Sequence, residues 1–157
     1  MADRADASTK TAGSTQPATE TFKGCFGCGT DNPVSMKLDF QPEGDGVEAR
    51  TSVAKEYAGY REFVHGGVVA TLLDEAMGWA LLHATGNYGV TRNLNVTYRR
   101  PLTIDRPIVV RATIVETNGR TVRLAASIAD QRGRVLASAE GDWSMVRKER
   151  AAGRPNQ

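Results

Sequence analysis

Two adjacent carboxylates, Asp74 and Glu75, interrupt a long apolar run between His65 and Gly86. Val, Leu, Ala and Met recur in this run at helical spacing and cover far more than a third of the circumference, so the run predicts a helix buried on most sides. Burying a carboxylate costs free energy, and partial desolvation raises its pKa and its basicity. The pair is therefore the first candidate for acid–base or nucleophilic chemistry.

His65, Gly66 and Gly67 stand where this helix begins. The first N–H groups of a helix lack intrahelical acceptors and face outward at the positive end of the dipole. Glycine lets a ligand approach the backbone closely, so this end predicts a site for an oxyanion. The glycines are equally compatible with a tight turn from loop to helix. His65 is expected to hold the loop by hydrogen bonds, and the alternative is that it acts as a base.

The helix has one side that breaks the apolar pattern. At about 100° per residue, Thr71, Gly78 and Leu82 fall along one line, which Asp74 and Glu75 flank. We expect this line to be the open side of the helix. Two carboxylates at mid-helix would each cost a few kcal/mol in lipid, so a soluble core helix is predicted and no membrane partner.

Strand patterns occur on both sides of the helix in the sequence. They cover residues 36–41 and 47–53 before it, separated by the turn PEGDG, and residues 88–99, 108–117, 121–130 and 135–146 after it. Asn118-Gly119 is a strong hairpin signal. A helix buried on most sides and accompanied by antiparallel strands requires one curved sheet wrapped around it.

The composition predicts one domain. The chain has 157 residues, of which 40% are hydrophobic and 24% charged, as is usual for a globular protein with a single core. Residues 1–20 show no apolar periodicity and predict a disordered tail, and residues 149–157 predict a flexible C-terminal tail, which leaves 21–148 as the domain. No apolar run resembling a signal peptide stands at the N-terminus, so a cytoplasmic location is expected.

The net charge of +2 conceals a concentration of basic residues in the segment 92–157. They recur at strand spacing and indicate either solvated strand faces or a positive rim for a small polyanion. Nucleic acid is not an expected partner, because neither interleaved aromatics nor a recognition-helix pattern accompanies them.

Cys25 and Cys28, in CFGCG, are the only cysteines. A CxxC pair can be half of a zinc site, but no second pair follows and the only histidines, His65 and His83, belong to the central run. A tight glycine-rich turn is therefore expected, with no metal. A zinc ion shared between subunits and a redox pair are the alternatives.

Four segments together resemble the hotdog-fold acyl-CoA thioesterases of the phenylacetate-pathway (PaaI-like) group. They are FKGCFGCGTDNPVSMKLDF, VHGGVVATLLDEAMGWAL, TRNLNVTYRRPL and RGRVLASAEGDW, and the similarity spans residues 22–147. The most specific part is HGG followed by an acidic group on the helix. The resemblance implies an α+β hotdog fold, with a six-stranded antiparallel sheet wrapped around one long central helix. It also implies hydrolysis of an acyl-CoA or aryl-CoA substrate without a cofactor, by homodimers or homotetramers with interfacial active sites.

The resemblance assigns roles to individual residues. The catalytic carboxylate of the group stands nine positions after the HGG histidine, which is Asp74 here, as nucleophile or as the base that activates water. The alternatives are that Glu75 is the reactive group, or that both carboxylates are paired with arginines and inert. Gly66 becomes the N–H donor that polarises the thioester carbonyl. Thr91 matches the hydroxyl that orients the attacking water.

The strand of residues 88–99 adds a polar side to this prediction. Thr91, Asn93, Asn95 and Thr97 share one side by strand alternation, which suits either a wet active-site groove or a sheet edge that meets a partner. Asn95 is included among the substrate-binding candidates.

The remaining substrate-binding candidates are Gly67, Arg99 and Arg100. The two arginines close the strand in YRRP and could contact the phosphates of CoA, although surface solvation explains them equally well. The loop before HGG reads YAGYREFV and lacks the Asn or Gln that some relatives use to polarise the carbonyl. The second half of the oxyanion hole therefore has no assigned residue.

Two other functions compete with hydrolysis. The first is a non-catalytic hotdog module that binds acyl-CoA, and the second is an enoyl-CoA dehydratase. The dehydratase branch uses an Asp and His pair, whereas His65 and Asp74 stand nine residues apart with His65 at the helix start. Acidic residues within an otherwise apolar helix favour catalysis over binding alone.

Overall fold

The apolar run forms one α-helix, α1 (Gly66–Thr85), in a computed structural model that describes residues 22–146. His65 is the N-cap, and its Nδ1 accepts a hydrogen bond of 2.9 Å from the Gly67 N–H. The helix ends at Gly86, whose φ of 67° lies in the left-handed region that glycine adopts without strain. The two predicted tails, residues 1–20 and 149–157, lie outside the described residues.

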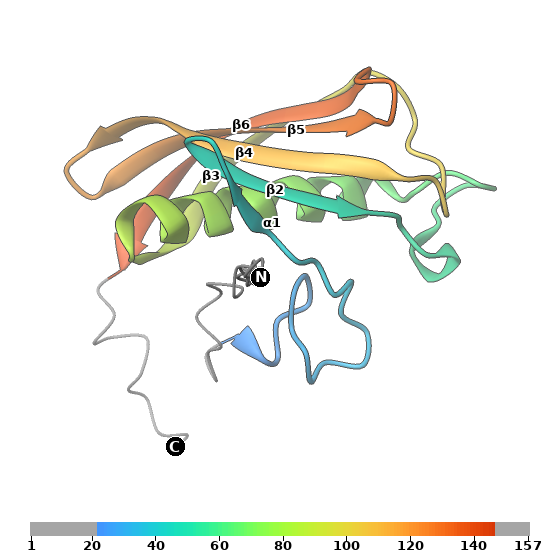
Figure 1. The fold of residues 1–157 in the computed structure, drawn as a ribbon, viewed down its shortest axis with the longest axis horizontal. Helices are drawn as coiled ribbons and strands as arrows, with labels where there is room; N and C mark the ends of the chain where they lie inside the picture. The colour runs from blue at the N-terminus through green and yellow to red at the C-terminus, as the bar shows by residue number, and fades with distance from the viewer. Residues whose placement is uncertain (1–21, 147–157) are drawn as a thin grey trace, which may run out of the picture.

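Six antiparallel strands form one sheet along one side of α1, as Figure 1 shows. In chain order they are β1 (Gln41–Glu43), β2 (Gly46–Thr51), β3 (Tyr88–Tyr98), β4 (Ile108–Asn118), β5 (Thr121–Asp130) and β6 (Val135–Val146). Their order across the sheet is β1-β2-β4-β5-β6-β3. The predicted hotdog architecture is therefore confirmed, and β3 forms one edge of the sheet.

The core lies between α1 and the face of the sheet that it covers. Leu72, Leu73, Met77 and Leu81 of the helix are fully buried. They belong to one cluster with alternate residues of the central strands, which are Val110, Val122, Leu124 and Ile128. Truncation of such a side chain to alanine costs about 2–5 kcal/mol, so this interface holds the helix in place. No helix in the described part of the chain is long and apolar enough to cross a membrane.

The first strand differs from its prediction over residues 36–41. β1 begins only at Gln41 and has three residues. The preceding backbone bonds elsewhere: the Met36 N–H donates to the Phe26 carbonyl at 3.1 Å, and the Leu38 N–H donates to the carbonyl of Gly27 at 3.0 Å. The prediction of a strand over residues 36–40 is therefore wrong. The backbone N–H groups that would pair with a neighbouring strand donate instead to carbonyls of the cysteine-containing segment.

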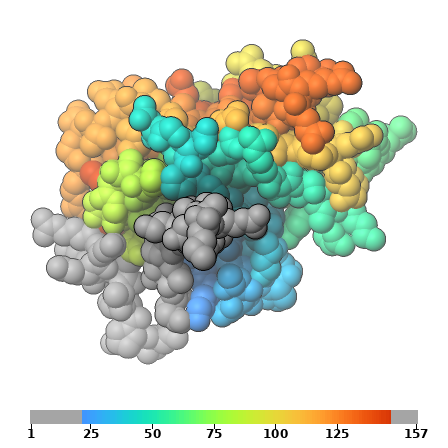
Figure 2. All heavy atoms as spheres, in the orientation of Figure 1, coloured from blue at the N-terminus to red at the C-terminus, as the bar shows by residue number. Residues whose placement is uncertain are grey.

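The N-terminal loop, residues 22–40, packs against the side of α1 that the sheet leaves open. Figure 1 shows it in blue below the helix, and Figure 2 shows its blue surface below the turquoise surface of β1 and β2. The Phe22 ring lies 5.5 Å from that of Trp79 in α1 and 5.2 Å from that of Tyr88 in β3, measured between centroids. The predicted burial of the helix on most sides is thus confirmed, with sheet and loop on opposite sides.

A bulge in β3 changes which residues share a side. The register against β6 shifts between Thr91 and Asn93, so one extra residue stands in β3. Thr91 pairs with Trp143, and beyond the bulge Leu94 pairs with Gly141. Trp143 and Gly141 are both buried on the helix side of β6, so Thr91 and Leu94 face the helix.

The prediction that Thr91 shares a polar side with Asn93, Asn95 and Thr97 is therefore wrong. Asn95 and Thr97 pair with Glu140 and Ser138 on the outer face of the sheet. Strict alternation puts residues two apart on one side, but a single inserted residue reverses the side of everything that follows. Thr91 alone of this set turns towards α1.

Candidate active site

Both carboxylates of the helix line one hollow of about 260 Å³. Gly78 and Leu82, which belong to the predicted open side of α1, line it with them. The rest of its wall comes from the N-terminal loop, from the helix and from two strands: Phe22, Cys25, Cys28, Trp79, Tyr88, Gly89, Val90, Thr91 and Trp143. The hollow is mainly apolar and aromatic, with its polar groups gathered near the middle of α1.

Asp74 is held by a strand. The Thr91 hydroxyl donates a hydrogen bond of 2.8 Å to Oδ1 of Asp74, across 17 residues of sequence. Burial raises the pKa of Asp74 above its usual value, and the hydrogen bond from Thr91 opposes that shift by favouring the ionised form. The result is an oriented carboxylate that is more basic than an exposed aspartate.

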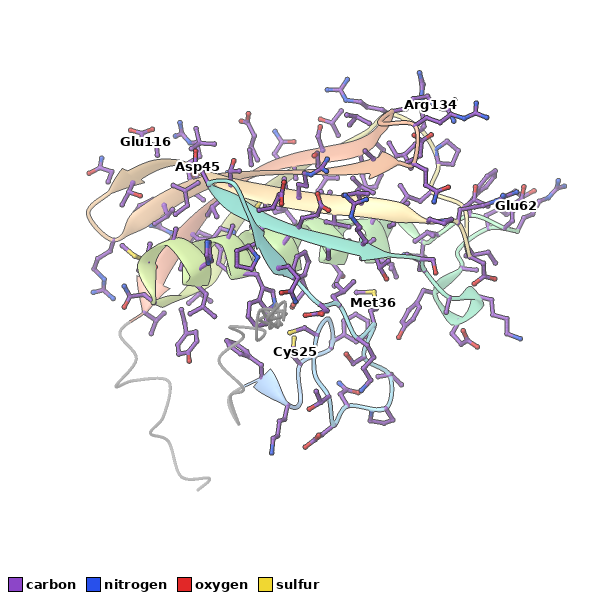
Figure 3. The ribbon with its side chains drawn as sticks, in the orientation of Figure 1. Cys25, Met36, Asp45, Glu62, Glu116 and Arg134 are labelled. Carbon is purple, nitrogen blue, oxygen red and sulfur yellow. The ribbon has the colours of Figure 1, made fainter. Side chains whose placement is uncertain are left out.

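Glu75 has a different environment, although it is the next residue. The Cys25 thiol donates to Oε1 of Glu75 at 3.2 Å, and Figure 3 shows Cys25 in the N-terminal loop below the helix. No ion pair of residues 22–146 involves either Asp74 or Glu75. Within the described residues, the arginine pairing that one alternative predicts for both carboxylates is therefore not found.

The CFGCG segment makes the tight turn that its glycines predict, since the Gly29 N–H donates to the Cys25 carbonyl at 2.9 Å. Neither Cys25 nor Cys28 forms a disulfide bond within the described residues. Burial, followed by the nearby Glu75 carboxylate, raises the pKa of the Cys28 thiol well above its usual range. Sequence reasoning missed the contact of this turn with Glu75, because nothing local signals a contact between residues 50 positions apart.

The start of α1 presents the backbone of Gly66. Within the described part of the chain its N–H has no hydrogen-bond acceptor, whereas the Gly67 N–H is used by the side chain of His65. The Tyr98 hydroxyl donates to the Gly66 carbonyl at 2.8 Å, which ties the helix start to the end of β3. Tyr98 was not among the predicted site residues, because its partner stands 32 positions earlier.

A second hollow, also of about 260 Å³, lies at this end of the helix. Gly66, Arg99 and Arg100 line it together. Two exposed guanidinium groups and the positive end of a helix dipole form a surface that favours anions. Asn95, on the outer face of the sheet, lines neither hollow.

One chain does not bring the oxyanion donor and the carboxylate to the same point. Gly66 and Asp74 stand eight residues apart on a single helix, which corresponds to about 12 Å along its axis. A carbonyl oxygen must lie about 3 Å from its donor while the attacking group lies within a similar distance of the carbonyl carbon. Within one chain, therefore, the Gly66 N–H and the Asp74 carboxylate are too far apart to act on the same carbonyl group.

Comparison with known proteins finds similarity to one family. The family model for the thioesterase superfamily matches residues 62–137. An uncharacterized mitochondrial membrane protein of Saccharomyces cerevisiae, FMP10, is 32% identical over 90 residues, which are 55% of this chain and 37% of that protein. The acyl-coenzyme A thioesterase THEM4 of Mus musculus is 32% identical over 66 residues, which are 42% of this chain and 28% of that protein. The matched part thus spans about a third of these two relatives.

Solved structures share the fold. A protein of the thioesterase superfamily superimposes with a TM-score of 0.74 at 25% identity, over 83% of this chain and 70% of that one. A hypothetical thioesterase from Streptococcus pneumoniae, crystallised with coenzyme A, superimposes with a TM-score of 0.65 at 23% identity, over 70% of this chain and 89% of that one. The hotdog fold is therefore shared with proteins of the thioesterase superfamily.

Proposed function

We propose that this chain is an acyl-CoA thioesterase of the PaaI-like kind, which hydrolyses an acyl-CoA or aryl-CoA thioester to the free acid and CoA. The observation that carries the proposal is Asp74, a half-buried carboxylate with a raised pKa that Thr91 orients in a largely apolar hollow. A desolvated and positioned carboxylate is suited to general-base or nucleophilic chemistry. The match to the thioesterase superfamily and the CoA-bound neighbour support thioester hydrolysis as that chemistry.

The reaction requires an attack on the thioester carbonyl carbon. As a base, Asp74 takes a proton from water while the water oxygen bonds to that carbon, and the proton then passes to the departing CoA thiolate. As a nucleophile, Asp74 bonds to that carbon while the carbon–sulfur bond breaks and CoA leaves as a thiolate that takes up a proton. Water then hydrolyses the resulting mixed anhydride, which releases the free acid and restores the Asp74 carboxylate. In both routes negative charge develops on the carbonyl oxygen, and the free Gly66 N–H at the helix start is the donor that stabilises it.

The distance between these two groups along α1 leads us to place each active site between two subunits. The Gly66 N–H of one subunit would face the Asp74 of its partner in a homodimer, which could pair further into a homotetramer. β3 supports this arrangement because it is an 11-residue edge strand whose outer edge has no partner within the described chain. Arg99 and Arg100, beside Gly66, would then lie where the phosphates of CoA enter.

The test is release of free thiol from short, long and aromatic acyl-CoAs by the purified full-length protein. Asp74→Asn is nearly isosteric and should lower turnover about 10²-fold or more on every ester that the wild type hydrolyses. Asp31→Asn is the matched control, because Asp31 also accepts a threonine hydroxyl, at 3.0 Å from Thr30, but on an exposed surface.

Two outcomes would contradict the proposal. Near-wild-type turnover by Asp74→Asn would exclude its role and move attention to Glu75, which Glu75→Gln examines separately. Tight binding of acyl-CoA without release of thiol would favour the competing function, an acyl-CoA-binding module.

A further inference from the structure

Cys25, Cys28 and Glu75 bring two thiols and one carboxylate together between the N-terminal loop and α1. One donor atom of each lies within 4.8 Å of the other two, and all three residues are half-buried. In a tetrahedral zinc site, bonds of about 2.3 Å to sulfur and 2.1 Å to oxygen place neighbouring donors roughly 3.5–3.8 Å apart. Small side-chain movements would therefore let the three donors meet one zinc ion.

The charge of the cluster points to a cation. Among the described residues Glu75 has no lysine or arginine in an ion pair, and its hydrogen-bond partner is the Cys25 thiol. A half-buried carboxylate without a counter-ion costs free energy. Sulfur donors select zinc and similar soft or borderline metals over magnesium and calcium, which prefer oxygen donors alone.

The backbone between the two cysteines packs closely against the Glu75 side chain. A Cβ on Gly27 would lie 2.3 Å from both Cγ and Cδ of Glu75, so no larger residue fits there without displacing that side chain. The Leu38 N–H holds the Gly27 carbonyl at 3.0 Å, and the Gly29 N–H holds the Cys25 carbonyl at 2.9 Å. The donors are thus carried by a turn whose own hydrogen bonds fix its shape.

We propose that Cys25, Cys28 and Glu75 bind one zinc ion, which fastens the N-terminal loop to α1. Two thiol protons are released to solvent as the two sulfur–zinc bonds form, and no oxidant is required. No further His, Cys, Asp or Glu of the described residues joins this group, which leaves the fourth zinc position for water. The site goes beyond the proposed thioester hydrolysis and does not depend on it.

The first experiment measures metal content. The full-length protein is purified without chelator, incubated with zinc, dialysed and subjected to elemental analysis. We expect about one zinc per chain in the wild type and a loss of most of it in Cys28→Ser and in Glu75→Gln. Glu140→Gln, which removes an exposed carboxylate from the outer face of β6, is the matched control and should keep its zinc.

A second experiment uses the wild type alone, so that a misfolded variant cannot obscure the result. Cobalt added to the reduced protein should produce the near-ultraviolet charge-transfer absorption of thiolate–cobalt bonds, and zinc should abolish it by competition. Zinc should also slow the reaction of the two thiols with a disulfide reagent about tenfold or more, and a chelator should restore the rate.

The proposal is overturned if the folded wild type retains no zinc, if Cys28→Ser retains as much as the wild type, or if cobalt gives no charge-transfer band. None of these readouts involves thioester hydrolysis, so the zinc site and the proposed activity stand or fall separately.

Discussion

Asp74 and Glu75 are neighbours in sequence, yet the structure gives them different hydrogen-bond partners. A turn of about 100° per residue along the helix directs Asp74 to the hydroxyl of Thr91 in β3 and Glu75 to the thiol of Cys25 in the N-terminal loop. The oxygen and sulfur partners differ in what they do to each carboxylate. Thr91 stabilises the ionised form of Asp74, whereas Cys25 and Cys28 surround Glu75 with groups that can join it in binding a metal.

The hydrogen bond from Thr91 to Asp74 leads to a prediction about how activity depends on pH. Thr91→Val keeps the size of the side chain but removes the donor that favours ionised Asp74, so the pKa of Asp74 should rise further above its usual value. A base works only when ionised, so activity that falls with decreasing pH should fall at a higher pH in the variant. The measurement is kcat/KM against pH for the wild type and Thr91→Val.

Thr97→Val is the control for this comparison, because Thr97 pairs with Ser138 on the outer face of the sheet. Its pH profile should match that of the wild type. An acid limb of Thr91→Val that stays in place, or moves to lower pH, would show that Thr91 does not tune Asp74.

How much of the site the sequence could predict depends on how far apart the interacting residues stand. The helical run and the two glycines at its start are local patterns, and they located the candidates Gly66 and Asp74. The contacts of Tyr98 with Gly66 and of Cys25 with Glu75 span 32 and 50 positions, and no local pattern encodes them. They arise only when strands and loops pack.

At the scale of elements, the same distinction separates the predicted strands. The sequences of β5 (Thr121–Asp130) and β6 (Val135–Val146) show alternating patterns, and both strands begin and end at the predicted residues. The strand predicted over 36–41 failed because its backbone bonds to the N-terminal loop. The bulge in β3 was also unpredicted, because one inserted residue leaves no mark in composition.

The N-terminal loop should depend on Gly29. A Cβ at this position would lie 2.4 Å from the Lys23 carbonyl oxygen and 2.5 Å from both the N and the O of Cys25, which are backbone atoms that cannot move independently. We expect Gly29→Ala to lower the free energy of unfolding by about 1–3 kcal/mol. Thermal and urea denaturation of the full-length protein measure this loss.

Gly24→Ala is the matched control in the same loop, since a Cβ there would meet nothing within 4 Å. It should leave stability unchanged or raise it slightly, by less than about 1 kcal/mol, because alanine restricts the unfolded chain. Equal stability of the two variants would show that the turn is not packed as the structure places it.

At the scale of the whole molecule, the position of β3 and the length of α1 bear on assembly together. β3 is an edge strand of 11 residues, and an edge of this length is usually covered or paired. The free N–H of Gly66 and the carboxylate of Asp74 are separated by eight residues of helix. A twofold dimer that pairs the β3 edges would cover the exposed strand edge. It would also bring the Gly66 N–H of one subunit to the Asp74 of the other if the start of one helix lay beside the middle of the other.

This assembly predicts the outcome of mixing two inactive variants. Asp74→Asn removes the carboxylate, and Gly66→Pro removes the proposed donor N–H. Proline is tolerated at the first position of a helix, and the extended backbone of His65, with ψ of 136°, suits the residue before a proline. A Cβ on Gly66 would come no closer than 3.7 Å to the Tyr98 hydroxyl, so both variants should fold, which circular dichroism and size-exclusion chromatography check first.

After random exchange of equal amounts, about half of the dimers contain one subunit of each variant. In each mixed dimer one site carries both lesions, and the other combines an intact Gly66 with an intact Asp74 from the opposite subunit. About a quarter of wild-type thioesterase activity should therefore return, because half of the sites in half of the dimers are complete. If each site were built within one subunit, mixing would restore no activity, and the interfacial site would have to be abandoned even if Asp74 proved essential.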